Sequence, residues 1–147
     1  MQQFKFFLFS LFVTLGLCGC WTSPCRSTGG MEISQAEGGQ PGQYVDDLCF
    51  GEWLRVESAL ARRAPSGILQ AQVNLRNVKK DIDDDGREDD FTAQYEIRWF
   101  DAKGFEVLPD SCIWRHLTWH GGETRAIKEC APTPEAVRYV LRLRHAK

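Results

Sequence analysis

The residues from Phe91 to Trp99 alternate between apolar and polar side chains. On one face of an extended chain lie Phe91, Ala93, Tyr95, Ile97 and Trp99, and on the other lie Thr92, Gln94, Glu96 and Arg98. A period of two with many aromatic and β-branched residues predicts a half-buried β-strand. The turn residues from Asp101 to Gly104 follow, and Phe105 to Val107 is predicted to begin a return strand. A strand–turn–strand unit is therefore expected at the centre of the fold.

Five further segments are predicted to be strands. They cover residues 54–60, 69–76, 114–119, 124–129 and 137–144. Turn residues such as Pro65-Ser66-Gly67 separate them. About seven short strands at this spacing predict an all-β fold, an immunoglobulin-like sandwich of two sheets. Trp99 and Trp114 are expected in its core, whereas Trp53 and Trp119 are candidates for surface aromatics.

The N-terminus carries a leader. Lys5 is followed by an apolar run from Phe6 to Leu17, which is shorter than the ~20 residues of a membrane-spanning helix and has the length of a signal helix. Leu17-Cys18-Gly19-Cys20 resembles the lipobox of bacterial lipoproteins. This resemblance implies cleavage after Gly19 and attachment of lipid, including palmitate, to Cys20. An ordinary secreted protein cleaved nearby is the alternative.

The lipobox resemblance also implies a location. Because Trp21 and not Asp follows Cys20, lipoprotein sorting in Gram-negative bacteria implies the outer membrane, with the domain facing the periplasm. Glycine, proline and polar residues dominate the next stretch and predict a flexible tether. The expected organisation is a signal peptide over residues 1–19, a lipidated tether over residues 20–48 and a sandwich domain over residues 49–147.

The domain resembles the YcfL-type family of small bacterial envelope lipoproteins, whose domain has no assigned function. The likeness covers roughly residues 53 to 145. It rests on the segments Gln72–Asn77 and Tyr95–Asp101 with Gly104, on Trp114, and on Ala131-Pro132 with Ala136. The resemblance implies an immunoglobulin-like sandwich and an envelope location, and it transfers no catalytic residue.

An acidic insertion departs from that family pattern. Asp81, Asp83 and Asp85 precede Gly86, and Asp89 follows. Oxygen ligands at positions 1, 3, 5 and 9 with glycine at position 6 match the front half of a calcium loop. Position 12 is Thr92, where an EF-hand has a glutamate. A calcium site at a hairpin tip is one interpretation, and a solvated acidic turn that discourages edge-to-edge association is the other.

The cysteines predict disulfides. After cleavage, Cys25, Cys49, Cys112 and Cys130 remain beside the acylated Cys20. An even number in an oxidising compartment indicates two bonds. Three pairings exist, and we favour Cys112–Cys130, which would join two neighbouring strands, with Cys25–Cys49, which would close the tether onto the domain. Zinc is disfavoured because no C-x-x-C occurs and the histidines are scattered.

Function is less constrained than location. The chain lacks the common catalytic motifs, so an enzyme is not expected, and Glu123 near His120 is interpreted as a turn partner. The formal net charge of −2 gives no reason to expect nucleic acid. A basic strip occupies the last strand, at Arg138, Arg142, Arg144 and Lys147. It is either a solvated face or a surface that docks to acidic lipid head groups or to an acidic partner.

Three hypotheses follow. The first is a lipid-anchored, non-enzymatic accessory or binding module that contacts another envelope protein. The second is a calcium-stabilised periplasmic structural domain with its site in residues 81–90. The third and weakest is an enzyme or a carrier for a small ligand.

Overall fold

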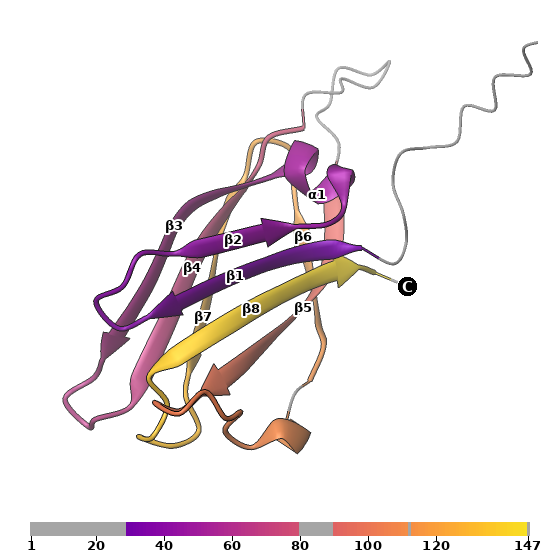
Figure 1. Ribbon diagram of the computed structural model, residues 1–147. Coiled ribbons are helices and arrows are strands. Elements are labelled where there is room, and N and C mark those ends of the chain that lie inside the picture. Colours follow the sequence, from indigo (N-terminus) through magenta and orange to yellow (C-terminus); the bar gives the residue numbers. More distant parts are fainter. Residues whose placement is uncertain (1–28, 80–89, 112, 147) are drawn as a thin grey trace, which may run out of the picture.

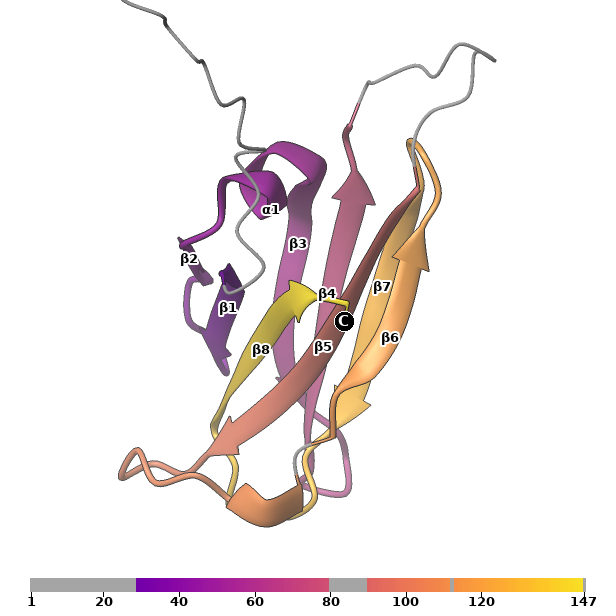
Figure 2. The same cartoon turned by 90° about the vertical axis from the view of Figure 1, so that its right-hand side faces the viewer.

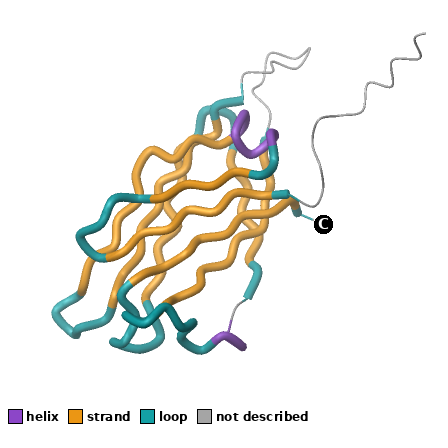
Figure 3. The backbone as a smooth tube through the Cα atoms, in the orientation of Figure 1, coloured by secondary structure: helices purple, strands orange, loops and turns teal. Residues whose placement is uncertain are grey.

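The computed structural model describes residues 29–79, 90–111 and 113–146. Strands make up most of this region, and the loops gather at the two ends of the molecule (Figure 3). The elements in chain order are β1 (Gly30–Ala36), β2 (Gly42–Val45), α1 (Leu48–Trp53), β3 (Leu54–Arg63), β4 (Leu69–Asn77), β5 (Phe91–Phe100), a 3-10 turn (Pro109–Ser111), β6 (Arg115–Trp119), β7 (Thr124–Cys130) and β8 (Arg138–His145). Among the described residues, no helix is long and apolar enough to span a membrane.

Two antiparallel sheets face each other, as the sequence predicts (Figures 1 and 2). The five-stranded sheet has the order β2-β1-β8-β5-β6, and the three-stranded sheet has the order β3-β4-β7. Alternate residues of each strand point between the sheets. From β4 these are Leu69, Ala71, Val73 and Leu75, and from β8 they are Tyr139, Leu141 and Leu143. The all-β two-sheet sandwich is therefore confirmed.

The short helix α1 closes one end of the sandwich, which we call the α1 end. Asp47 begins the helix, because its carboxylate accepts a hydrogen bond from the Cys49 amide at 2.9 Å. The other Asp47 oxygen lies 2.9 Å from His145 Nε2 at the end of β8. Phe50 is fully buried, and its ring centroid lies 5.2 Å from that of Phe91. One aspartate thus ties the helix to the last strand.

The predicted tether over residues 20–48 is wrong for its C-terminal part. β1 pairs with β8 from Gly30↔Arg144 to Ala36↔Arg138, and β2 pairs with β1. The high glycine content made these strands resemble a linker in the sequence. Two of the glycines permit close packing. A Cβ at Gly30 would overlap the Leu143 carbonyl oxygen, and one at Gly42 would lie 2.8 Å from Ser34 Oγ. The part of the chain that the structure describes thus contains eight strands, compared with about seven expected.

The predicted return strand at Phe105–Val107 forms a single bridge, Phe100↔Glu106. The turn before it has the expected chemistry, since Asp101 accepts hydrogen bonds from the amides of Lys103 and Phe105, each at 2.9 Å. Pairing stops because Leu108 has a φ of 53° and the 3-10 turn then redirects the chain. The edge of β5 is covered instead by β6.

Two tryptophans exchange their predicted environments. Trp119 is fully buried, whereas Trp114 is half-buried. The register explains this difference, because Trp119 pairs with Phe91 and Arg115 pairs with Tyr95. Trp119 therefore faces the core, and Trp114, five residues earlier, falls on the opposite face of the sheet. Trp99 is buried, as predicted.

Candidate functional site

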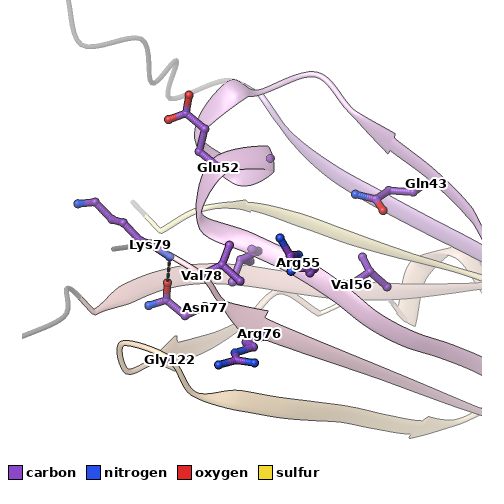
Figure 4. Close-up of a pocket in the computed structure, with 11 residues that line it drawn as sticks. Gln43, Glu52, Arg55, Val56, Arg76, Asn77, Val78, Lys79 and Gly122 are labelled. Atoms are coloured by element: carbon purple, nitrogen blue, oxygen red, sulfur yellow. Dashed lines mark hydrogen bonds between the residues drawn. The ribbon is translucent and has the colours of Figure 1, made fainter. Parts of the chain in front are cut away.

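A cavity of about 620 Å³ opens at the α1 end, over the edge and outer face of the three-stranded sheet (Figure 4). We call it the basic cleft. Its polar lining comes from Gln43, Glu52, Arg55, Arg76, Asn77 and Lys79. These residues belong to β2, α1, β3, β4 and the segment that follows β4, so the sandwich brings together positions far apart in the sequence.

The basic cleft is built around two arginines. Arg55 of β3 and Arg76 of β4 are direct cross-strand partners, so their side chains leave the same face of the sheet with Cβ atoms about 5 Å apart. Both are exposed. Neither guanidinium forms an ion pair or a side-chain hydrogen bond within the described residues. Like charges placed directly opposite each other destabilise a sheet, so this pair carries an uncompensated cost.

Asn77 and Lys79 of the basic cleft are held in place by neighbouring groups. Asn77 is fully buried, and its amide donates to the Trp119 carbonyl oxygen at 3.3 Å. Its side-chain oxygen accepts the Lys79 amide at 3.1 Å (Figure 4). The Lys79 ammonium lies 3.9 Å from the centroid of the Trp53 ring, a cation–π contact. Trp53 is partly buried at this site, where it supports a cation.

Charge determines what the basic cleft can bind. Arg55, Arg76 and Lys79 supply three positive charges, and Glu52 supplies one carboxylate. Guanidinium groups present paired N–H donors that match the oxygens of carboxylates and phosphates. The basic cleft therefore suits an anionic group.

The outer face of the five-stranded sheet also carries arginines, but these have partners. We call this set the arginine ladder. Arg142 Nε donates to Glu32 at 2.8 Å and its Nη1 donates to Glu96 at 3.0 Å, while Arg98 Nε donates to Glu96 at 3.1 Å. Arg98 also reaches Glu106 at 3.5 Å. The Glu96 side chain is 2% exposed, so cations from two strands neutralise a buried carboxylate.

The predicted basic strip belongs to this network. Arg144 donates to Gln94 at 2.8 Å and lies 3.8 Å from the Trp114 ring centroid. Arg138 lies 4.5 Å from the centroid of Phe100. Lys147 lies outside the described residues. Three of the four predicted cations are thus held by neighbouring side chains.

A smaller charged group bridges the two sheets. Arg115 of β6 donates to Glu129 of β7, and the Tyr95 hydroxyl lies 3.4 Å from the same carboxylate. The hydrogen bond with Tyr95 and the charge of Glu129 raise the pKa of Arg115. This group ties β6 to the opposite sheet.

The cysteines depart from the favoured pairing. Cys130 is a free, exposed thiol, so the predicted Cys112–Cys130 disulfide is not formed in the structure. Its premise fails because β6 and β7, although consecutive, lie in different sheets. Cys49 is buried and disulfide-bonded. Its predicted partner Cys25, like Cys112, lies outside the described residues.

Other predicted sites also lie outside the described residues. These are the lipidation site Cys20 and the calcium candidates Asp81, Asp83, Asp85 and Asp89. Within residues 29–79, 90–111 and 113–146, no group of three or more His, Cys, Asp or Glu side chains could hold a metal ion. Glu123 accepts the His120 amide at 2.9 Å, which confirms its interpretation as a turn partner.

Sequence reasoning missed Arg55 and Arg76. Each was assigned to a strand, but nothing in the spacing reveals that the two strands pair in this register. A weaker signal was available. Arg55 begins one predicted strand and Arg76 ends the next, and these two ends lie together if the two strands form a hairpin. Only the pairing of β3 with β4 brings the two charges together.

Two solved structures are similar to this chain. A DUF1425 family member from Shewanella sp. pv-4 has 23% sequence identity and a TM-score of 0.51, with coverage of 84% of this chain and 94% of that one. Cj0090 from Campylobacter jejuni has 18% identity and a TM-score of 0.52, with coverage of 62% and 85% respectively. At these identities the likeness concerns the fold alone.

The comparison with family models identifies a family for this chain, which the structural comparison does not. No curated protein matches the chain. The model of DUF1425, described as a protein of unknown function, matches residues 43–145. This match begins ten residues before the expected limit of residue 53, in β2, and so includes part of the predicted tether. The chain therefore belongs to the DUF1425 family.

Proposed function

We propose that this protein is a lipid-anchored, non-enzymatic binding module of the bacterial cell envelope, and that it contacts an acidic surface of another envelope protein through the basic cleft. The observation that carries the proposal is the pairing of Arg55 with Arg76 across β3 and β4, where neither guanidinium forms an ion pair within the described residues. A sheet that keeps such a pair sacrifices stability. An anionic partner recovers that stability on binding.

The anchor and the location rest on the sequence. Leu17-Cys18-Gly19-Cys20 supports lipidation at Cys20, and Trp21 supports the outer membrane with the domain facing the periplasm. Cys20 is nine residues from Gly29, so an extended chain reaches at most about 30 Å. Labelling of living cells with a fatty-acid probe tests this part. The natural chain is expected to incorporate the probe, and the Cys20→Ser variant is expected not to. Labelling that persists in this variant would contradict the proposed lipid anchor.

Envelope crosslinking and pull-down test the basic cleft. The full-length protein is expected to capture a protein partner, and Arg55→Glu with Arg76→Glu is expected to lose at least about tenfold of the captured amount. Arg62→Gln is the matched control, because Arg62 lies on β3 and already has a partner in Gln70 at 3.2 Å. Capture should also weaken as salt rises above about 0.15 M, where the Debye length is only about 8 Å. Equal losses in the control and the double variant would contradict the proposal.

Calcium stabilisation remains the second proposal, supported by the aspartate spacing of residues 81–89. It predicts that millimolar calcium raises the melting temperature of the full chain. Replacing Asp83 and Asp85 by Asn should abolish the rise. A melting temperature that does not change when calcium is added would contradict this proposal. It would leave the proposal for the basic cleft unaffected.

A further inference from the structure

A second hollow, of about 290 Å³, opens on the outer face of the five-stranded sheet at the α1 end. It lies apart from the basic cleft and shares no lining residue with it. Its side chains come from β1, from β2 and the residue after it, from β8, and from the residue before β6. Those used here are Glu32, Tyr44, Asp46, Trp114, Arg142 and Arg144. We call it the Tyr44–Trp114 hollow.

Gly30 lets the backbones of β1 and β8 approach closely at the base of this hollow. Gly30 of β1 pairs with Arg144 of β8, and a Cβ at this position would overlap the Leu143 carbonyl oxygen. The Gly30 amide donates to the Asp46 carboxylate. Bare backbone therefore forms part of the floor, and aromatic side chains from β2 and from the residue before β6 flank it.

The two aromatic residues are available for stacking. The Tyr44 side chain is 64% exposed. One face of the Trp114 indole is covered by the Arg144 guanidinium at 3.8 Å, and the hydrogen bond from Arg144 to Gln94 holds that guanidinium in place. Trp114 is partly exposed and lines the hollow, so part of its indole surface is accessible there.

The charges of the hollow balance. Arg142 and Arg144 are matched by Glu32 and Asp46, so the hollow offers N–H donors and carboxylate acceptors without net charge. Hydrogen-bonding groups of both kinds beside aromatic faces suit a neutral ring that has an apolar face and several hydroxyl groups. A volume of about 290 Å³ is at the lower end of the range for small-molecule sites and suits one or two such rings.

We propose that the Tyr44–Trp114 hollow binds a neutral sugar ring, a hexopyranose unit of an envelope oligosaccharide. The ring stacks on Trp114 and Tyr44, and its hydroxyl groups donate to Glu32 and Asp46 and accept from the arginines. This site is independent of the basic cleft, whose excess positive charge selects anions.

The test is a titration of the full chain in detergent micelles with chitotriose and, separately, with maltotriose. The indole N–H signals are followed by NMR, and Trp114→Phe identifies the Trp114 signal by its loss. A saturable shift of this signal in the millimolar range is expected with at least one sugar. Which sugar produces the shift distinguishes an N-acetylhexosamine glycan from a neutral glucan.

Three variants separate stacking from general effects. Tyr44→Ala on the edge strand β2 should weaken sugar binding at least about fivefold. Phe105→Ala should leave it unchanged, because Phe105 is also an exposed aromatic, 70% exposed, but lies beyond the other end of β5. Arg55→Glu should also leave it unchanged, which keeps the outcome separate from that of the basic cleft.

Three results would overturn the inference. The first is no saturable shift with either sugar. The second is a shift that survives Tyr44→Ala undiminished. The third is a shift produced by inorganic phosphate and by neither sugar, which would assign the hollow to an anion.

Discussion

The two outer faces of this sandwich use arginine in opposite ways. On the five-stranded sheet, Arg142 and Arg98 surround the buried carboxylate of Glu96 and reach further acidic side chains. On the three-stranded sheet, Arg55 faces Arg76 directly, with no acceptor for either guanidinium among the described residues. The first arrangement pairs its charges within the chain, and we propose that the second is completed by another molecule.

This contrast separates structural charge from binding charge. A count of basic residues draws attention to β8, which carries three arginines in the described part of the chain. Those arginines are occupied by Glu32, Glu96, Gln94 and aromatic rings. Within the described residues the two arginines of the basic cleft have no such partner, so we take the pairing state of a cation as the better indicator of a proposed anion site.

The largest expected effect tests the arginine ladder. Arg142→Met removes two charge-assisted hydrogen bonds and leaves Arg98 as the described cation that still contacts Glu96. Removing one partner of a buried ion pair leaves the remaining charge, here the Glu96 carboxylate, with less compensation. The free energy of unfolding should therefore fall by about 2–4 kcal/mol. Urea denaturation measures this change.

Arg138→Met is the matched control for that variant. Arg138 lies on β8 over the Phe100 ring and shows no ion pair within the described residues, so its replacement should cost less than about 1 kcal/mol. Equal costs for the two variants would mean that the arginine ladder contributes no more than ordinary side-chain packing.

A middle-sized effect concerns an unpaired polar group in the core. The Tyr139 hydroxyl is buried and has no hydrogen-bond partner in the structure. Tyr139→Phe should raise the free energy of unfolding by about 1 kcal/mol, because it removes an unsatisfied buried donor. Urea denaturation at neutral pH checks this value, and a loss of stability would indicate that the hydroxyl has a partner in solution.

Tyr139 also predicts a pH dependence. Burial raises the pKa of Tyr139 to about 12, compared with about 10 for an unfolded chain. Between these two values the unfolded state releases the proton while the folded state keeps it. Stability should therefore fall as the pH rises from about 10 to about 12. The Phe variant should lack this part of the decline, as urea titrations at successive pH values would show.

The sequence predicted most of the fold because alternation survives in the strands that face the core. Phe91, Ala93 and Trp99 of β5, and Tyr139, Leu141 and Leu143 of β8, are buried as their spacing indicates. The pattern failed where few apolar residues mark a strand. In β1 only Met31 and Ile33 are buried apolar side chains, so glycine and glutamine made the segment resemble a linker.

The candidate sites were less predictable, because each depends on register. Arg55 meets Arg76 only through the pairing of β3 with β4. Trp114 reaches the outer face because β6 pairs with β5 at Tyr95↔Arg115, and a shift of one residue would have buried it instead of Trp119. A period of two tells which residues share a face, but it does not tell which residues of another strand lie opposite them.

The smallest expected effect on stability is the most informative about function. Arg55→Glu replaces the like-charge pair by Glu opposite Arg76. An opposite-charge cross-strand pair is worth about 0.2–1 kcal/mol, and the repulsion disappears as well, so the free energy of unfolding should rise by about 0.5–1 kcal/mol. Urea denaturation of the variant and of Arg62→Gln measures this difference.

The same substitution should weaken capture of an acidic partner by the basic cleft, though less than the double variant does. A variant that folds more stably than the natural chain and yet captures less partner cannot owe its defect to unfolding. Residues that lower stability but improve function are expected at binding sites, where a locally unfavourable arrangement is retained because a ligand uses it. If Arg55→Glu instead destabilises the fold, then Arg55 stabilises the sheet through solvent or packing. In that case the arginine ladder and the basic cleft differ in how exposed their arginines are, and the difference does not mark a binding site.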